Sequence, residues 1–422
     1  MKKVIAVFLV LLIITSIVFA KGAAETTARP EVVKLQVWYA LSGTSGESFK
    51  SKAEAFDIAR PDIELELTYS GKYADTATKV SAALLSGDAP DVAVMAAGQL
   101  YTGGRGDFSM EEFAKDPEFN ISDVYPGMLE YGKFDGRLAA VPFGISTQVL
   151  YYNKTICNAA GIDLEKNPPK TWEELLTLAK IAVEKGNINK SSDFYGFDTS
   201  DGVWLIKSMF SQNGNPVVKK AGDTVVPVFN EASGVEVATF WKKMIDSGIM
   251  PAGQHNNAEK KFLAGNLAII AASSNRISRW QGNTSFELGA IPMPKFSQNA
   301  LALGGNVMVI LSEDQFKKEA GWELVKHMLK EENQTDFALS TGYLPIRKSS
   351  QQNPKVQELF ISNPLYKIAF EQLDYTWAYL HFSEMGTMDA MFWYALDEIE
   401  KAVLSPKAAL DKAAASLIKE ME

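Results

Sequence analysis

The chain carries few residues suited to acid–base or nucleophilic catalysis. Among its 422 residues the only histidines are His255, His327 and His381, and Cys157 is the only cysteine. No HExxH, CxxC or GxSxG motif occurs, so no local pattern indicates a zinc site or a nucleophilic triad. The sequence therefore predicts no catalytic residue, no metal-ligand set and no cofactor.

Pairs of acidic residues leave one enzymatic alternative open. Glu173-Glu174 and Asp397-Glu398 could in principle supply the two carboxylates that glycoside hydrolases use. Both pairs fall on helical patterns, where charged residues usually face solvent. A secreted carbohydrate-active enzyme is therefore kept as a remote alternative.

Aromatic and hydroxyl side chains are better supplied, and together they suit a polar small molecule. Aromatic residues make up 11% of the chain, and their rings can cover the C–H faces of a polyhydroxylated ligand while hydroxyl groups bond its oxygens. The candidates for these two roles are Trp38, Tyr73, Trp204, Trp280, Tyr343 and Trp377, with Ser146, Ser273 and Ser274. For each tryptophan the alternative is packing in a core, and for each serine it is a turn or helix cap.

The overall charge excludes one class of partner. The net charge is −9 and the pI about 5.2, whereas nucleic-acid binding needs clustered lysine and arginine. An acidic surface fits a protein kept apart from its copies by like charge. We expect no nucleic-acid partner and a monomer.

The elements that must position these residues follow an α/β order. Residues 33–39 alternate apolar and polar, which predicts a strand, and residues 63–68 repeat the pattern. A polar turn at Gly43–Gly46 precedes a helical pattern that begins near Phe49. A further helix from Tyr73 and an apolar strand at residues 92–95 complete a β-α-β-α-β unit, so a largely parallel sheet is expected.

A second unit of the same kind follows. Residues 148–152 form a strand pattern, and Thr171 with Glu174 forms a capping box that starts a helix. Buried strands are predicted at residues 267–271 and 307–311. Because 422 residues are too many for one compact core, two lobes are expected.

The N-terminus has the pattern of a secretory signal. Lys2 and Lys3 precede an almost wholly apolar run to Phe19, and Ala20 stands at the expected cleavage point. This predicts a signal peptide over residues 1–20, with a retained membrane anchor as the alternative. Cys157 is far from the cleavage point, so no lipid anchor is expected and the mature chain is predicted to be periplasmic or extracellular.

Five segments carry a family resemblance through their order and spacing. They are Leu84–Val92, Val149–Lys154 with Pro169–Leu175, Phe262–Ile269, Gly289–Pro294 and Thr341–Ile346. Together they resemble the extracellular solute-binding proteins, family 1, of ABC importers for sugars and related polyols. Each motif is weak alone, but the series extends over nearly the whole mature chain. The peptide-binding members of the superfamily and surface adhesins are the other non-enzymatic alternatives.

The resemblance implies a fold and partners. It implies a type II periplasmic-binding-protein fold, in which two α/β lobes joined by crossover strands hold a ligand between them. We place the lobes at residues 21–145 plus 303–340 and at residues 146–302 plus 341–422. The implied partners are a saccharide, polyol or polyol phosphate and the permease subunits of an ABC importer.

The nearest likeness is to the glycerol-3-phosphate-binding branch. Its ligand contacts fall here on Tyr73, Ser146, Ser273, Gly305 and Tyr343. Two charged contacts of that branch do not carry over, because they align near Ala97 and Phe392. Arg276 and Arg279 could replace the lost arginine from another direction, and a phosphate needs such charge-assisted donors. We therefore favour a neutral saccharide or polyol, with sn-glycerol-3-phosphate as the alternative.

Overall fold

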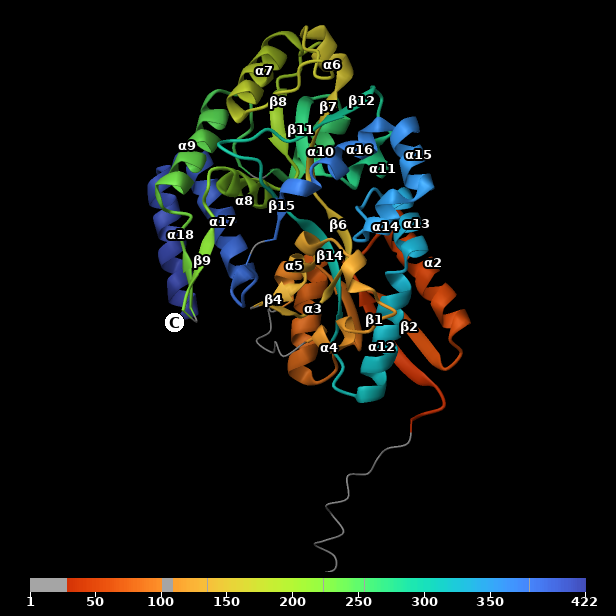
Figure 1. Ribbon diagram of the computed structural model, residues 1–422. Helices are drawn as coiled ribbons and strands as arrows, with labels where there is room; N and C mark the ends of the chain where they lie inside the picture. The colour runs from red at the N-terminus through yellow and green to blue at the C-terminus, as the bar shows by residue number, and fades with distance from the viewer. Residues whose placement is uncertain (1–28, 101–108, 135, 223, 254, 379) are drawn as a thin grey trace, which may run out of the picture.

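The computed structural model describes residues 29–100, 109–134, 136–222, 224–253, 255–378 and 380–422. The signal peptide predicted over residues 1–20 lies outside these ranges. Figure 1 shows two lobes, one above the other, each built around its own sheet. Within the described residues, none of the helices combines the length and apolar character that a membrane crossing needs.

The first lobe contains a five-stranded sheet. Its strand order is β2(Ile63–Tyr69), β1(Val33–Tyr39), β3(Val92–Met95), β14(Gly304–Ile310) and β6(Val141–Ser146). The β-α-β-α-β unit predicted from the sequence is confirmed, because β1 pairs in parallel with both β2 and β3. The strand β14, which returns from much later in the chain, is antiparallel to both of its neighbours.

Helices and short strands surround this sheet. They are α2(Gly43–Ala59), α3(Tyr73–Ser86), η1(Ala97–Gln99), α4(Glu111–Ala114), η2(Ile121–Asp123), α5(Pro126–Tyr131), β4(Lys133–Phe134), β5(Arg137–Leu138), α12(Gln315–Met328) and α13(Glu331–Thr341). The turn predicted at Gly43–Gly46 is wrong, since α2 already begins at Gly43. Gly46 packs tightly there, as an added Cβ would lie 2.6 Å from the carbonyl oxygen of Leu41.

The second lobe contains a four-stranded sheet. Its order is β12(Leu288–Ile291), β7(Gln148–Asn153), β11(Leu267–Ser273) and β8(Tyr195–Thr199). Its helices and hairpin are α6(Lys154–Ala159), α7(Trp172–Lys185), α8(Gly202–Gln212), β9(Val218–Ala221), β10(Thr224–Pro227), α9(Ala232–Asp246), η3(His255–Asn257), α10(Ala258–Leu263), α11(Arg276–Trp280), α16(Pro364–Glu371), α17(Met385–Glu400) and α18(Pro406–Met421). The capping box predicted at Thr171 and Glu174 is confirmed at the start of α7.

The buried residues form two clusters. One surrounds the first sheet and continues onto one face of the second, where Tyr151 and Ile270 lie. The other fills the space between the opposite face, with Leu150 and Ile269, and the outer helices. The alternation of side chains along β7 and β11 thus divides the apolar residues of the second sheet between two cores.

The chain passes between the sheets near residues 147, 303 and the segment after α13. The strand β6 ends at Ser146 and β7 begins at Gln148, while the short strand β13(Leu301–Ala302) directly precedes β14. β13 pairs with β15(Thr376–Trp377), which Figure 1 places between the lobes. The last connection contains α14(Lys348–Gln352), α15(Pro354–Ser362) and η4(Leu373–Tyr375).

The division of residues between the lobes stays a prediction, and the contacts bear on its last boundary. After α13, Leu344 donates its N–H to the carbonyl oxygen of Ile145 at 2.7 Å, and Ile346 accepts from the N–H of Tyr125 at 3.0 Å. Both partners belong to the first lobe, whereas α16 contacts β7 and β12. We propose that the chain re-enters the second lobe at α16 rather than at Thr341.

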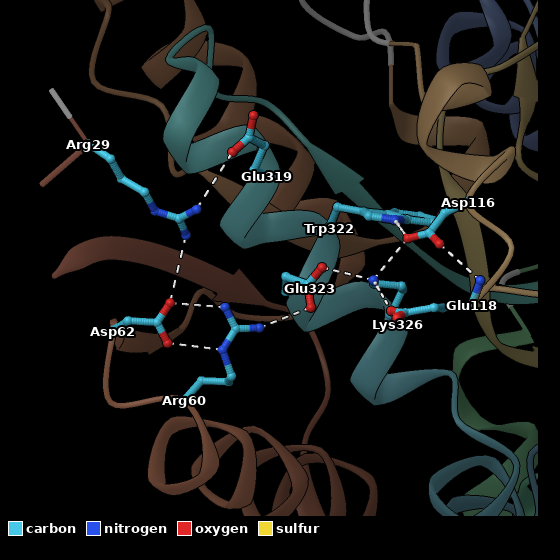
Figure 2. A network of polar contacts seen from close by, with 9 residues as sticks. All are labelled: Arg29, Arg60, Asp62, Asp116, Glu118, Glu319, Trp322, Glu323 and Lys326. Atoms are coloured by element: carbon cyan, nitrogen blue, oxygen red, sulfur yellow. Dashed lines mark hydrogen bonds and ion pairs between the residues drawn. The ribbon is translucent and has the colours of Figure 1, made fainter. Parts of the chain in front are cut away.

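A network of charges braces the outer side of the first lobe (Figure 2). Arg60 bonds both oxygens of Asp62, at 2.9 and 3.0 Å, and Glu323 at 2.9 Å. Lys326 lies 2.8 Å from each of three carboxylates, those of Asp116, Glu118 and Glu323. These ion pairs connect α12 to the turn between α2 and β2 and to the loop after α4.

Candidate ligand-binding site

Three polar side chains meet at the edge of the first lobe, close to the crossovers. Tyr73 begins α3, Asn306 lies near the start of β14, and Tyr343 follows α13. The hydroxyl oxygens of Tyr73 and Tyr343 are 3.2 Å apart, and Asn306 Nδ2 donates to Tyr73 Oη at 3.2 Å. We call these residues the tyrosine–asparagine group. The sequence named both tyrosines and missed Asn306, because a lone asparagine in a strand gives no signal of its partners.

The protons of this group can be assigned from its contacts. Asn306 Nδ2 also donates to the carbonyl oxygen of Gly144 at 3.3 Å, and a carbonyl can only accept, so the amide orientation is fixed. Burial raises the pKa of Tyr73 well above its usual value, and the hydroxyl of Tyr343 raises it further, so this phenol keeps its proton. One phenolic proton joins the two tyrosines, and the other has no acceptor among the described residues, whichever tyrosine donates. The group therefore presents one hydrogen-bond donor to a ligand.

Two glycines allow the backbone to close up beside this group. Gly305 has φ +114°, and a Cβ there would lie 2.0 Å from the carbonyl oxygen of Gly144. At Gly144 a Cβ would lie 2.9 Å from Asn306 Nδ2 and 3.3 Å from Cγ of Tyr343. Only glycine fits these two positions of the β6–β14 pair.

A second group of polar residues lies at the crossover, on the side of the second lobe. Ser146 ends β6, and Ser273 ends β11 opposite Gln148. Between them, Ser274 donates its N–H to the carbonyl oxygen of Thr147 at 2.8 Å. Ser146, Thr147 and Ser274 are buried.

Polar atoms at this crossover lack partners. Thr147 Oγ1, Ser274 Oγ and Asn306 Oδ1 are buried and make no hydrogen bond within the part of the chain that the structure describes. A buried polar atom without a partner costs about 1–3 kcal/mol. A ligand or water bonding these atoms would remove that cost, as expected of a site that binds a hydroxylated molecule.

The predicted tryptophans divide between this region and the cores. Trp204, on α8, donates Nε1–H to the carbonyl oxygen of Ala302 at 3.0 Å, and its ring lies where a Cβ on Gly304 would be 2.7 Å away. It therefore lies at the second crossover. Trp38 is half-buried against the first core. Trp280 is 1% exposed, with its ring 5.1 Å from Tyr151 and 5.3 Å from Phe262, so it fills a core and offers no face to a ligand in this conformation.

Of the two arginines proposed to bind a phosphate, Arg276 is already paired, and Arg279 is exposed. Arg276 Nε donates to Glu259 Oε1 at 2.7 Å, and Nη1 donates to Asn275 Oδ1 at 3.0 Å. Phe392, which aligns with the arginine of the glycerol-phosphate branch, is buried against Phe229 at a ring distance of 4.5 Å. Neither Arg276 nor Phe392 supplies an uncompensated positive charge.

Four further residues lie near the crossovers where the two lobes meet, and none of them was predicted from the sequence to lie there. Tyr131, on α5, donates to the carbonyl oxygen of Gly305 at 3.3 Å, and its ring lies 5.5 Å from that of His381. Burial lowers the pKa of His381 to about 4, so the imidazole is neutral. Lys207 on α8 and Asp389 on α17 form an ion pair of 2.7 Å. Lys207 and Asp389 are 182 positions apart in the sequence, so no local motif could indicate that they form a pair.

The candidate catalytic groups are held in other parts of the fold. Cys157 is buried, which raises the pKa of its thiol to about 12. Glu174 closes the capping box of α7, and Glu173 pairs with Lys243 at 2.6 Å. His255 lies between Asp198 and Glu400 in the second lobe. Among the described residues, no group of three or more His, Cys, Asp or Glu side chains is arranged to hold a metal ion.

Two hollows occur away from the crossovers. One of about 420 Å³ lies on the first lobe beside Arg60, Glu323 and Lys326. Another of about 240 Å³ lies on the second lobe over His255 and Glu400. Neither contains the tyrosine–asparagine group, which therefore remains the site supported by unpaired buried polar atoms.

Comparison with known proteins places the chain in a family. Residues 52–364 match the family model described as bacterial extracellular solute-binding protein. The sn-glycerol-3-phosphate-binding periplasmic protein UgpB of Yersinia pestis is 27% identical over 409 residues, covering 90% of each chain.

Solved structures share the fold at low identity. The cyclic α-maltosyl-1,6-maltose binding protein of Arthrobacter globiformis has a TM-score of 0.78 at 22% identity, covering 92% of this chain and 100% of its own. UgpB of Mycobacterium tuberculosis, in complex with glycerophosphocholine, has a TM-score of 0.79 at 20% identity, covering 92% and 99%. The predicted two-lobed type II periplasmic-binding-protein fold is thereby confirmed. This chain belongs to the family of bacterial extracellular solute-binding proteins.

Proposed function

We propose that this chain is the solute-binding component of an ABC importer and that its ligand is a neutral saccharide or polyol. The observation that carries the proposal is the set of unpaired polar atoms of Thr147, Ser274 and Asn306, buried beside the tyrosine–asparagine group at the crossovers. Hydroxyl groups both donate and accept, so they can satisfy these atoms together with the phenolic donor. In two-lobed folds of this kind, a ligand that touches both lobes favours the closed form.

The alternative ligand is sn-glycerol-3-phosphate, which the similar UgpB protein of Yersinia pestis is named for binding. A phosphate buried between the lobes needs charge-assisted donors. Arg276 is paired with Glu259, and Lys207 with Asp389. These pairings favour a neutral ligand over a phosphorylated one.

The remaining parts of the role are proposals of the same kind. Cleavage after Ala20 would release a periplasmic or extracellular monomer that meets the permease subunits of the importer. The ligand would be released chemically unchanged, since the three histidines are held in hydrogen bonds and Cys157 is buried away from the crossovers.

A thermal-shift screen tests the proposal. The panel is maltose, tagatose, glycerophosphocholine and sn-glycerol-3-phosphate. At 100 times its dissociation constant a ligand stabilises the folded state by about 2.7 kcal/mol, which is visible as a higher melting temperature. We expect a clear shift with a neutral sugar and little shift with sn-glycerol-3-phosphate. A shift with sn-glycerol-3-phosphate alone would establish the alternative ligand.

A further inference from the structure

The ion pair between Lys207 and Asp389 is asymmetric in its exposure. Lys207 Nζ lies 2.7 Å from Asp389 Oδ1, and the two side chains are 5% and 40% exposed. The lysine is thus almost enclosed by the second lobe, while the carboxylate faces outward. A buried ammonium needs a partner, so Lys207 fixes the position of a carboxylate that other molecules can still reach.

The position of Asp389 is at the junction of the lobes. It lies one turn into α17, whose first residue, Met385, packs near η1 of the first lobe: a Cβ on Gly98 would lie 3.5 Å from Met385 Cγ. Figure 1 shows this end of α17 beside the first lobe. His381, just before α17, donates Nδ1–H to the carbonyl oxygen of Lys133 at 3.2 Å.

Contacts of α8 and α17 place this carboxylate near the crossover. Trp204, on the same helix as Lys207, lies where a Cβ on Gly304 would be 2.7 Å away, and α17 contacts η1 of the first lobe. Burial raises the pKa of Tyr131, and the neighbouring Tyr343 and the carboxylate of Asp389 raise it further. Tyr131 in turn bonds the backbone of Gly305, next to Asn306. Asp389 therefore lies on the second lobe near the crossover whose first-lobe side carries the tyrosine–asparagine group.

The two sides of this space have complementary hydrogen-bonding character. The first lobe presents a neutral phenolic donor, and the second presents a carboxylate, which can only accept. A ligand hydroxyl can accept from the phenol and another can donate to the carboxylate. A fully ionised phosphate group has only acceptor oxygens, and its charge would be repelled by the carboxylate.

We propose that Asp389 is a ligand-binding residue, which accepts a hydrogen bond from a hydroxyl group of a neutral ligand and selects against phosphorylated ligands. This inference rests on the proposed function, and it assigns the choice between the two ligand classes to one side chain. Lys207 acts through Asp389 as a positioning residue.

The test compares Asp389→Asn with the matched control Asp411→Asn. Asp411 lies on the neighbouring α18, pairs with Lys407 and is 43% exposed, so its carboxylate matches that of Asp389 in exposure and in having a lysine partner. Binding of maltose, tagatose and sn-glycerol-3-phosphate is measured by calorimetric titration of the full mature chain. Melting temperatures of the ligand-free variants verify that both are folded.

In Asp389→Asn we expect the neutral sugar that binds the wild type to bind about tenfold or more weakly, since hydrogen bonds to charged groups contribute about 1.5–3 kcal/mol. Binding of sn-glycerol-3-phosphate should strengthen by about tenfold, and Asp411→Asn should change neither. Equal sugar affinity in the wild type and Asp389→Asn would overturn the inference and leave the proposed function standing. Wild-type binding of sn-glycerol-3-phosphate alone would overturn both the inference and the proposal of a neutral ligand.

Discussion

Replacing His255 with glutamine is expected to lower the free energy of unfolding by about 3–5 kcal/mol. His255 Nδ1 lies 2.5 Å from Asp198 Oδ1, and Nε2 lies 3.0 Å from Glu400 Oε1, with all three side chains buried. Trp241 and the N–H of Gly253 also donate to Glu400, at 2.7 and 2.6 Å. Without the imidazolium, two buried carboxylates lose the positive charge that compensates them. Chemical denaturation measures the change.

The matched control is His327→Gln. His327 is half-buried on α12, and its imidazole makes one hydrogen bond, 3.1 Å from the carbonyl oxygen of Lys52, so its loss should cost about 1 kcal/mol or less. Equal destabilisation by the two substitutions would contradict the importance of the charges around His255.

The same variant has a distinct pH signature. Burial lowers the pKa of His255, but the hydrogen bonds and charges of Asp198 and Glu400 outweigh burial and raise it from 6.5 to about 10. A raised folded-state pKa gives stability that is fully present below about pH 6.5 and is lost as the pH rises through 10. The melting temperature of the wild type should therefore fall more over this range than that of His255→Gln. Parallel curves would contradict the assignment.

Gly305→Ala is expected to destabilise the protein by about 3 kcal/mol or more and to abolish ligand binding. The alanine would have to adopt the backbone angle φ +114°, and its Cβ would lie 2.0 Å from the carbonyl oxygen of Gly144. Strain at such a backbone angle costs about 1–3 kcal/mol, and the clash is with backbone, so β6 and β14 must separate. These strands carry Ser146 and Asn306, so their separation disrupts the site as well as the sheet.

The control for this substitution is Gly87→Ala. Gly87 has φ +85° at the end of α3, with nothing within 4 Å of an added Cβ, so it tests the backbone angle without the clash. We expect a cost of about 1 kcal/mol. If Gly305→Ala were as stable as Gly87→Ala and bound ligand normally, the close contact at Gly144 would not matter to the site.

Local patterns predicted the elements of the fold well. The alternation of residues 33–39 and the capping box at Thr171 are properties of neighbouring residues, and both elements occur as expected. The turn expected at Gly43–Gly46 is helical instead, because the packing of Gly46 against Leu41 decides the start of α2, and local composition does not report such a contact.

The site was predictable only in part. Motif matches led to Tyr73 and Tyr343, which the structure brings together. They could not lead to Asn306 or to the pair of Lys207 and Asp389, which meet only because β14 and α17 return from distant parts of the chain. Trp280 illustrates the opposite case, since the sequence left ligand contact and core packing both open, and the fold buries its ring between Tyr151 and Phe262.

The central claim is that two lobes close on a small solute, and small-angle X-ray scattering tests it most directly. The lobes are joined by crossover strands, so a ligand that bonds the tyrosine–asparagine group and Asp389 together should draw them closer. With a saturating concentration of the neutral sugar that stabilises the protein most, we predict a smaller radius of gyration than without ligand. An unchanged scattering profile at saturation would contradict a two-lobed solute trap.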